Sequence, residues 1–123
     1  MKKIITSLVL VLSINIFAAD KVLYCTEIGK VGFEPKKNYE QTTYTKERFT
    51  VKVNFEKKSF ISESIYFADY MDVTCEDNYR NEMICSNFMG NSFKLLQGGS
   101  KFIRTSIVNP DSIFIAHGNC EKF

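Results

Sequence analysis

The chain contains one stretch in which apolar and polar residues alternate strictly, RFTVKVNFE at residues 48–56. The apolar members are Phe49, Val51, Val53 and Phe55, and Arg48, Thr50, Lys52 and Asn54 stand between them. Because successive side chains of a β-strand point to opposite faces, this pattern predicts a strand with one face in the core and the other in water.

Shorter apolar stretches separated by turn residues continue along the chain. Residues 60–67 follow the polar turn around Lys57 and Lys58, and we expect them to pair with the first of these strands. The stretches SFKLLQ and SKFIRTSIV flank Gly98-Gly99, a dipeptide suited to a two-residue hairpin. A proline-containing turn at residues 109–112 precedes SIFIAHG, the expected last strand.

These elements predict an all-β fold. Nearly every connection is short enough to join neighbouring antiparallel strands, and no long window shows helical periodicity, although residues 66–71 could form one helical turn. We expect a small antiparallel meander barrel of about seven to nine strands, closed by pairing of the first and last strands. A β-sandwich of two sheets is the alternative fold.

The spacing of the cysteines favours disulfides over a metal site. Structural zinc sites use ligands about two to four residues apart, whereas the nearest two cysteines here have nine residues between them. No C-x-x-C redox motif is present. The four cysteines, an even number, are Cys25, Cys75, Cys85 and Cys120. An even number in a small exported domain is typical of a disulfide framework.

Strand parity suggests how these cysteines pair. If residues 71–76 and 82–88 form a hairpin, Cys75 lies directly opposite Cys85, at a separation that suits a disulfide. Residues 79–81 would form the loop of that hairpin. By elimination, Cys25 would pair with Cys120 and tie the two ends of the domain together.

Residues 1–19 have the layout of a secretory signal peptide. Two lysines precede an apolar run that ends at Ala18 and Ala19, and the run is shorter than the roughly 20 residues that span a bilayer. An uncleaved anchor is the alternative. We expect cleavage to leave residues 20–123 as a single β-domain without a membrane span, in the periplasm or secreted.

The expected mature domain is formally neutral. The chain has 16 Lys and Arg against 14 Asp and Glu, and the two surplus lysines lie within the expected signal peptide. A neutral chain without a basic cluster lacks the electrostatic footprint of a nucleic-acid-binding protein. We therefore expect no nucleic-acid partner.

Residues 34–47, EPKKNYEQTTYTKE, form the longest polar stretch, and Tyr39 and Tyr44 are its only large apolar groups. Long ordered loops in compact domains are often functional. The two tyrosines are therefore candidate partner-binding residues. A solvent-exposed crossover without a function is the alternative.

His117 is the only histidine, so a histidine-dependent reaction would require it. It lies on the same strand face as Ile113 and Ile115, and parity around the turn at residues 109–112 would place Arg104 opposite it. A neighbouring cation would disfavour the charged imidazole. His117 and Arg104 are thus a second candidate site, with a structural histidine as the alternative.

No catalytic motif was found elsewhere in the chain. There is no nucleophile elbow, phosphate-binding glycine loop, zinc-protease motif or calcium loop. We therefore expect no catalytic residues, metal or cofactor. The 11 Phe and six Tyr, without any Trp, suit either a ligand-lined barrel or a core filled with rings.

Several segments together carry a resemblance to known proteins. The segments LYC, ERFTVKV, VTC and SIFIAHGNCEKF are spread over almost the whole mature chain, and this pattern resembles a set of short exported bacterial proteins of unknown function. More distantly, the layout is similar to the small periplasmic barrels that inhibit c-type lysozymes, which also begin near a Y-x-C and bridge the first strand to the last.

Those lysozyme inhibitors carry an S-G-x-x-Y loop that enters the enzyme. In this chain the nearest stretch rich in serine and glycine, Gly98-Gly99-Ser100, is followed by Lys101-Phe102. We therefore carry no functional residue across from that family.

A disulfide-bonded β-scaffold with variable loops is suited to binding another molecule. We expect an exported, non-enzymatic binding module for another envelope protein or a small apolar molecule. A protein partner predicts an exposed aromatic patch around Tyr39 and Tyr44. A small ligand predicts a cavity lined by Phe49, Val51, Val53 and Phe55. A small hydrolase-like enzyme centred on His117 and a structural envelope component are the alternatives.

Overall fold

The computed structural model describes residues 20–78, 80, 82–108 and 112–122. The expected signal peptide at residues 1–19 and most of the expected turn at residues 109–112 lie outside this part. The strands are β1 (Lys21–Glu34), β2 (Glu40–Thr43), β3 (Arg48–Asn54), β4 (Ser59–Ile61), β5 (Thr74–Asp77), β6 (Met83–Ser86), β7 (Asn91–Leu96), β8 (Lys101–Val108) and β9 (Ser112–Lys122).

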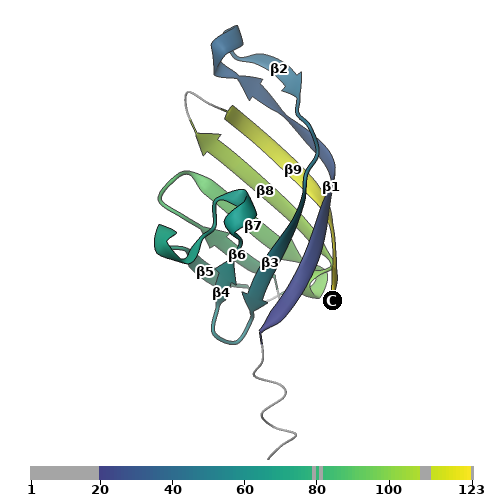
Figure 1. The fold of residues 1–123 in the computed structure, drawn as a ribbon, viewed down its shortest axis with the longest axis vertical. Helices are drawn as coiled ribbons and strands as arrows, with labels where there is room; N and C mark the ends of the chain where they lie inside the picture. Colours follow the sequence, from purple (N-terminus) through teal and green to yellow (C-terminus); the bar gives the residue numbers. More distant parts are fainter. Residues whose placement is uncertain (1–19, 79, 81, 109–111, 123) are drawn as a thin grey trace, which may run out of the picture.

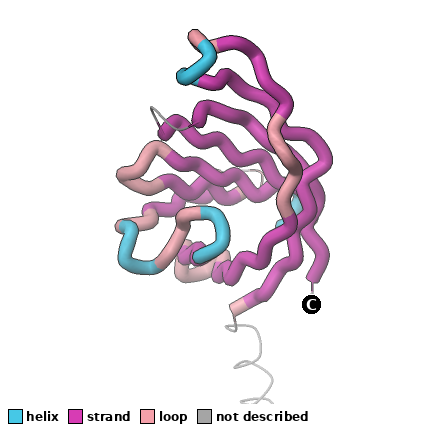
Figure 2. The backbone as a smooth tube through the Cα atoms, turned by 45° about the horizontal axis from the view of Figure 1, so that its top comes forward, coloured by secondary structure: helices cyan, strands magenta, loops and turns pink. Residues whose placement is uncertain are grey.

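The strands form one antiparallel sheet that curves into a nearly closed barrel (Figures 1 and 2). Their order is β4-β3-β1-β9-β8-β7-β6-β5, with the short β2 paired to the end of β1. The first long strand and the last one pair along most of their length, so the sheet ends at β4 and β5 rather than at the chain ends. The predicted all-β meander barrel is confirmed, and the sandwich alternative is not.

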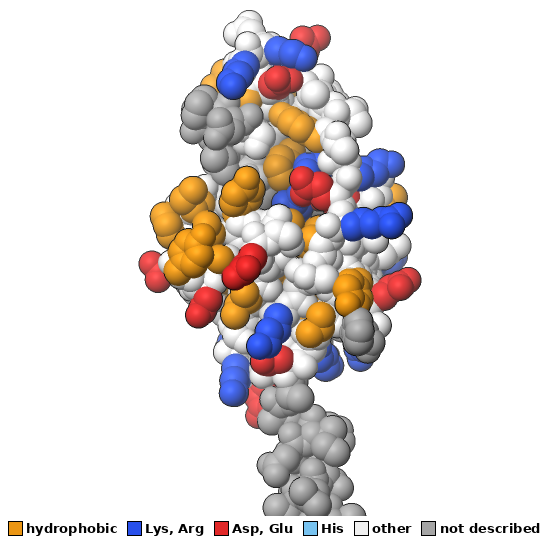
Figure 3. Space-filling view, in the orientation of Figure 1, with side chains coloured by type: hydrophobic (Ala, Val, Ile, Leu, Met, Phe, Trp, Pro, Cys, Tyr) orange, Lys and Arg blue, Asp and Glu red, His pale blue; other side chains and the backbone are white. Residues whose placement is uncertain are grey.

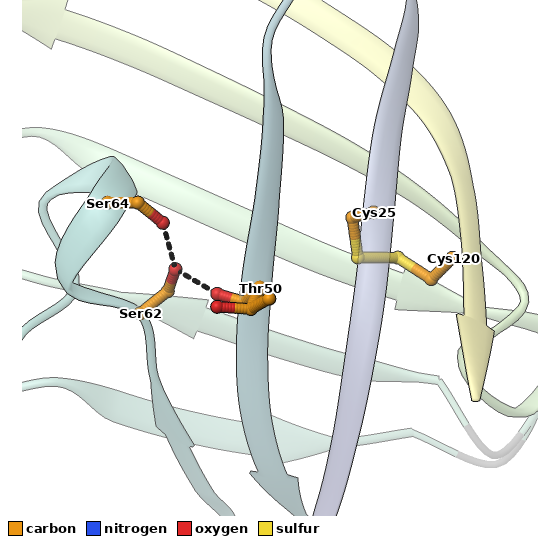
Figure 4. Close-up of a disulfide and its surroundings, with 5 residues drawn as sticks. All are labelled: Cys25, Thr50, Ser62, Ser64 and Cys120. Carbon is orange, nitrogen blue, oxygen red and sulfur yellow. Dashed lines mark hydrogen bonds between the residues drawn. A yellow bond between two sulfur atoms is a disulfide. The ribbon is translucent and has the colours of Figure 1, made fainter. Parts of the chain in front are cut away.

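Two disulfides fasten this barrel, and they join the pairs of cysteines predicted from strand parity. Cys25 of β1 and Cys120 of β9 are directly paired in the sheet and bonded through sulfur (Figure 4). Cys75 and Cys85 are likewise opposite each other in the β5–β6 hairpin.

Within the described ranges, no helix is long and apolar enough to cross a membrane.

A cluster of phenylalanine rings fills the barrel. Phe93 stacks on Phe102 and contacts Phe49, Phe60 and Phe67 at ring-centroid distances of 4.6–6.2 Å. These separations are typical of stabilising aromatic pairs.

The alternating strand at residues 48–56 contributes to this core. Phe49, Val51 and Val53 are at most 6% exposed, and Phe55 packs against the cluster from its edge. Phe49, Val51 and Val53 are therefore packed into the core, whereas the expected small-ligand cavity would need them to line an open space.

Residues 60–67 do not form the single strand that we expected. β4 ends at Ile61, and the 3₁₀ turns η2 (Glu63–Ile65) and η3 (Asp69–Met71) follow. Phe60 and Phe67 are both buried but have opposite strand parity, so a straight strand would expose one of them. The chain reverses instead, and main-chain hydrogen bonds of 2.9 Å join Ser62 and Phe67 in both directions.

Two other connections differ from their predictions. Residues 34–47 contain the 3₁₀ turn η1 (Pro35–Lys37) and β2, so much of this polar stretch is a hairpin on the end of β1. Between β7 and β8, Leu96 pairs with Lys101, which leaves four connecting residues instead of two. Gly98 and Gly99 do adopt positive φ values of 68° and 96°.

Candidate functional site: a charged cleft with an aromatic rim

A cleft of about 410 Å³ opens at one end of the barrel, between β1, β8 and β9 and the connection that contains η2. Its lining includes Lys30, Glu47, Asn91, Arg104, Ser106 and Phe114. In Figure 3, red and blue side chains lie in a hollow near the middle of the face, and apolar side chains gather beside it. We call this hollow the cleft.

Strand register brings the lining residues together. Lys30 of β1 and Arg104 of β8 both pair with Ala116 of β9, so they lie in one row across the sheet. Asn91 pairs with Ser106, and Ser106 pairs with Phe114, which makes the next row. Because both rows have the parity of the core residues, their side chains point inward.

A compact network of four charges forms one wall of the cleft. The Arg104 Nε donates to Glu27 Oε2, and its Nη2 donates to Glu47 Oε2, both at 2.7 Å. The Lys30 Nζ lies 3.5 Å from Glu27 Oε1 and 3.6 Å from Glu47 Oε2. The two positive and two negative charges balance, which offsets the cost of removing them from water.

The two carboxylates of this network differ in exposure. The Glu27 side chain is fully buried, and it also accepts a 2.8 Å hydrogen bond from the Glu47 main-chain nitrogen. The Glu47 side chain is 50% exposed, whereas those of Lys30 and Arg104 are only 6% exposed. Glu47 is therefore the outer member of the network.

An aromatic ring lies against both cations. Lys30 Nζ is 4.3 Å from the centroid of the Phe114 ring, and the Arg104 guanidinium carbon is 4.9 Å from it. The Tyr44 ring packs against Phe114 at 5.8 Å, and its hydroxyl donates to the Phe33 carbonyl at 3.0 Å. Cation–π attraction and packing thus hold the two cationic side chains in place.

One buried donor in the cleft wall has no partner. Asn91 is 4% exposed, and its side-chain nitrogen makes no hydrogen bond within the described part of the chain. Native proteins seldom leave such a group unpaired, and each case needs an explanation. Ser106, opposite Asn91, is also 4% exposed.

Large apolar side chains stand exposed beside the cleft. Tyr66 and Met89 line it, and they are 64% and 41% exposed; Phe88, next to Met89, is 71% exposed. We call Tyr66, Phe88 and Met89 the aromatic rim. Exposed apolar side chains beside a cleft are candidates for an interaction site.

The two loops that carry the rim are held by hydrogen bonds to Asn87. Its Oδ1 accepts from the main-chain nitrogens of Met89 and Asn91, and its Nδ2 donates to the Tyr66 carbonyl at 2.6 Å. Tyr66 has a positive φ of 64°, an uncommon conformation for a residue with a side chain. Buried neighbours on both sides, Ile65 and Phe67, anchor it. Asn87 thus joins the main chains of the two loops that carry the rim.

A second hollow, of about 430 Å³, lies on the outer face of the sheet. It is lined mainly by apolar side chains, among them Val31, Phe33, Ile107 and Ile115, which are 36–63% exposed. We call it the outer groove. The exposed groove residues Val31, Ile107 and Ile115 have the opposite strand parity to Lys30 and Arg104 of the cleft, so these two sets lie on opposite faces of the sheet. Phe114 borders both hollows.

Tyr39 and Tyr44, which were predicted to form one exposed aromatic patch, differ in exposure and in position. Tyr39 is 52% exposed at the tip beyond β1, with a positive φ of 62°. Tyr44 is partly buried and lines the cleft. Tyr66 lines the cleft and Phe88 is exposed next to Met89, which also lines it, and neither residue was a candidate in the sequence analysis.

The predicted pairing of Arg104 with His117 is wrong. Val108 pairs with Ser112, so three residues rather than two connect β8 to β9, and the register shifts by one. Arg104 is therefore opposite Ala116 and points into the cleft, whereas His117 is opposite Ile103 and exposed on the outer face.

Two members of the charged network, Glu27 and Arg104, could have been recognised from the sequence. In β1, Leu23, Cys25 and Glu27 share one parity, and in β8 the same holds for Phe102 and Arg104. Two opposite charges at core positions indicate a buried ion pair. Glu47 and the rim residues lie in irregular segments, where no periodicity could have placed them.

Among the described residues, no group of histidine, cysteine, aspartate and glutamate side chains is arranged to hold a metal ion. No family model, no characterised protein and no solved structure matches this chain. The two disulfides are typical of proteins that fold outside the cytoplasm.

Proposed function

We propose that this protein is an exported binding module that recognises another envelope or secreted protein through the aromatic rim and the cleft. The single observation that carries the proposal is the exposure of Tyr66, Phe88 and Met89 beside a polar cleft. Aromatic residues and methionine are enriched at the centres of protein interfaces, where a few such side chains supply most of the binding energy.

The hydrogen bonds that join the rim loops support this proposal. Asn87 fixes both rim loops, and the Ser62–Phe67 bridge closes the loop that carries Tyr66. A pre-ordered surface loses less conformational entropy on binding than a floppy one, so more of the contact energy appears as affinity. The apparent signal peptide and the disulfides together favour a site of action in the periplasm or outside the cell.

Binding of a small apolar molecule is the second candidate function. The outer groove supports it, because its lining is nearly all apolar and its volume suits a small ligand. The hydrolase-like alternative gains no support, since Arg104 and His117 lie on opposite faces of the sheet.

A photocrosslinking experiment separates the two faces. A photoreactive phenylalanine analogue is placed at Phe88 in the rim or, as a matched control, at Ile107 in the outer groove, where exposure is similar at 71% and 63%. Each protein is expressed with its N-terminal segment, irradiated in cells, and the adducts are identified by mass spectrometry.

We expect one discrete protein adduct from position 88 and not from position 107. The same adduct from both positions would indicate unspecific contact. An adduct confined to position 107 would move the proposal to the outer groove, and no protein adduct at either would contradict recognition of a protein partner.

A further inference from the structure

We propose that the cleft binds a carboxylate of the partner, which takes the place of the Glu47 carboxylate on Arg104 and Lys30. This inference rests on the proposed function, because it names the chemistry that the partner brings to the cleft. In the absence of the partner, the Glu47 carboxylate occupies the position that the partner's carboxylate takes on binding.

The cations are already arranged for a carboxylate. Arg104 and Lys30 both approach the same oxygen, Glu47 Oε2, at 2.7 and 3.6 Å. Both side chains are nearly buried and lie against the Phe114 ring, so they keep this arrangement when Glu47 leaves. A guanidinium held in this way is a strong and directional partner for an incoming carboxylate.

The Glu47 side chain can leave without disturbing the backbone that carries it. Its main-chain nitrogen donates to Glu27 Oε1, and its main-chain oxygen accepts from the Glu27 nitrogen at 3.0 Å. Neither bond involves the Glu47 carboxylate. Because that carboxylate is already half exposed, its rotation into water costs little solvation energy.

Departure of Glu47 changes the charge of the cleft. Among the described carboxylates, Glu27 alone then remains within 4 Å of Lys30 and Arg104, and its side chain is fully buried. The wall gains one net positive charge, which favours an anion over a neutral group. Asn91 Nδ2, which has no hydrogen-bond partner among the described residues, lies in the next row, about 7 Å along the strands from Arg104, and offers a further donor on the cleft wall.

The tethered Glu47 also explains why a rim is needed. A side chain attached to the same chain competes at an effective concentration on the order of millimolar or above. A free carboxylic acid can displace the Glu47 carboxylate only through its contacts within the cleft. A protein partner that also covers Tyr66 and Phe88 gains further binding energy from the rim. The arrangement thus selects a carboxylate presented beside an apolar surface.

Acetate binding to the Glu47→Gln variant tests this inference without knowledge of the partner. The side-chain Nε–H resonance of Arg104 is followed by NMR at pH 7 while sodium acetate is added at constant ionic strength. Glu40→Gln, which removes an exposed carboxylate from the same segment, is the matched control. Acetamide, similar in shape but neutral, is the control ligand.

We expect acetate to bind the Glu47→Gln variant about tenfold more tightly than it binds the wild type or the Glu40→Gln variant, and acetamide to leave the resonance unmoved. Equal binding to wild type and Glu47→Gln, no binding to either, or an equal response to acetamide would overturn the inference. Tight acetate binding to the wild type would also overturn it, because a small acid would then need no displacement of Glu47 and no rim.

A second titration keeps the inference testable if Glu47→Gln does not fold. Phenylacetate, which joins a ring for the rim to a carboxylate, should shift the Arg104 resonance of the wild type at lower concentration than acetate does. Phenylacetamide should not. If phenylacetate and acetate act alike, the inference is contradicted. The crosslinking result at Phe88 does not depend on either titration, so failure of this inference and failure of the proposed function can be told apart.

Discussion

Glu27 and Glu47 contact the same two cations, but their contributions to stability should differ. Loss of one partner from a buried ion pair leaves an uncompensated charge and costs about 3–5 kcal/mol, whereas exposed pairs contribute roughly 0–1 kcal/mol. Because the Glu27 side chain is fully buried and that of Glu47 is half exposed, we expect Glu27→Gln to lower the free energy of unfolding far more than Glu47→Gln does. Urea unfolding measures both variants. Equal losses would contradict this assignment of inner and outer carboxylates.

A separate residue-scale prediction concerns Glu82, at the start of the second arm of the β5–β6 hairpin. The Asn78 side chain donates to Glu82 Oε1 at 2.9 Å, and Lys94 lies 3.5 Å from the same oxygen. The Asn78 hydrogen bond has the largest effect and holds the pKa of Glu82 below its usual 4.5. Burial opposes it, and the Lys94 charge adds a lowering effect that is smaller than that of burial. Asn78→Ala should therefore raise this pKa, measured by NMR titration of the side-chain carboxyl carbon.

The pKa of Glu82 is lower in the folded state than in the unfolded state, so this interaction stabilises the fold above the unfolded pKa. The contribution is lost as the pH falls below 4.5 and through the folded value. Lys94→Gln should raise the pKa of Glu82 less than Asn78→Ala does. An unchanged pKa in the Asn78 variant would show that the hydrogen bond does not hold the carboxylate in solution.

At the scale of elements, the two disulfides close loops of very different length. The bonded cysteines are 95 residues apart in one pair and 10 in the other. Chain-entropy arguments give about 4.7 kcal/mol for the long loop and about 2.7 kcal/mol for the short one. We expect the Cys25→Ser/Cys120→Ser variant to lose more unfolding free energy in urea than the Cys75→Ser/Cys85→Ser variant. The reverse order would show that the Cys75–Cys85 disulfide of the β5–β6 hairpin stabilises the protein more than the Cys25–Cys120 disulfide between β1 and β9.

Strand register could be predicted from the sequence where the alternation of side chains and the expected pairing of the cysteines indicated the same alignment. The hairpin register that opposes Cys75 to Cys85 is correct, since a disulfide between directly opposed cysteines requires that alignment. The β8–β9 register was predicted one residue out because the length of a turn is not encoded in strand parity, and a shift of one residue moves every side chain to the other face. That single residue separated Arg104 from His117 and placed Arg104 in the cleft.

The reversal after β4 was missed for a different reason. Phe60 and Phe67 read as one apolar stretch, yet both are buried only because the chain turns back between them. This turn is also what exposes Tyr66 beside the cleft. Hydrophobic pattern alone does not show such a reversal, because main-chain bonds rather than side chains close it.

At the scale of the whole molecule, the barrel follows from alternating strands and paired cysteines, but the site does not. The cleft combines Lys30 from β1, Glu47 from the β2–β3 connection, Tyr66 from the β4–β5 connection, and Asn91 and Arg104 from β7 and β8. These residues meet only after the sheet has curved round (Figure 1). No local segment carries the pattern, which explains why sequence reasoning found the scaffold before its site.

Affinity capture with matched variants can show whether the aromatic rim recognises a protein partner. Oxidised wild-type domain, the rim variant Tyr66→Ser/Phe88→Ser and the outer-groove variant Ile107→Ser are immobilised and exposed to the same envelope extract. We predict one protein that is retained by the wild type and by Ile107→Ser but not by the rim variant. Retention of the same proteins by all three, or loss only from Ile107→Ser, would contradict the account.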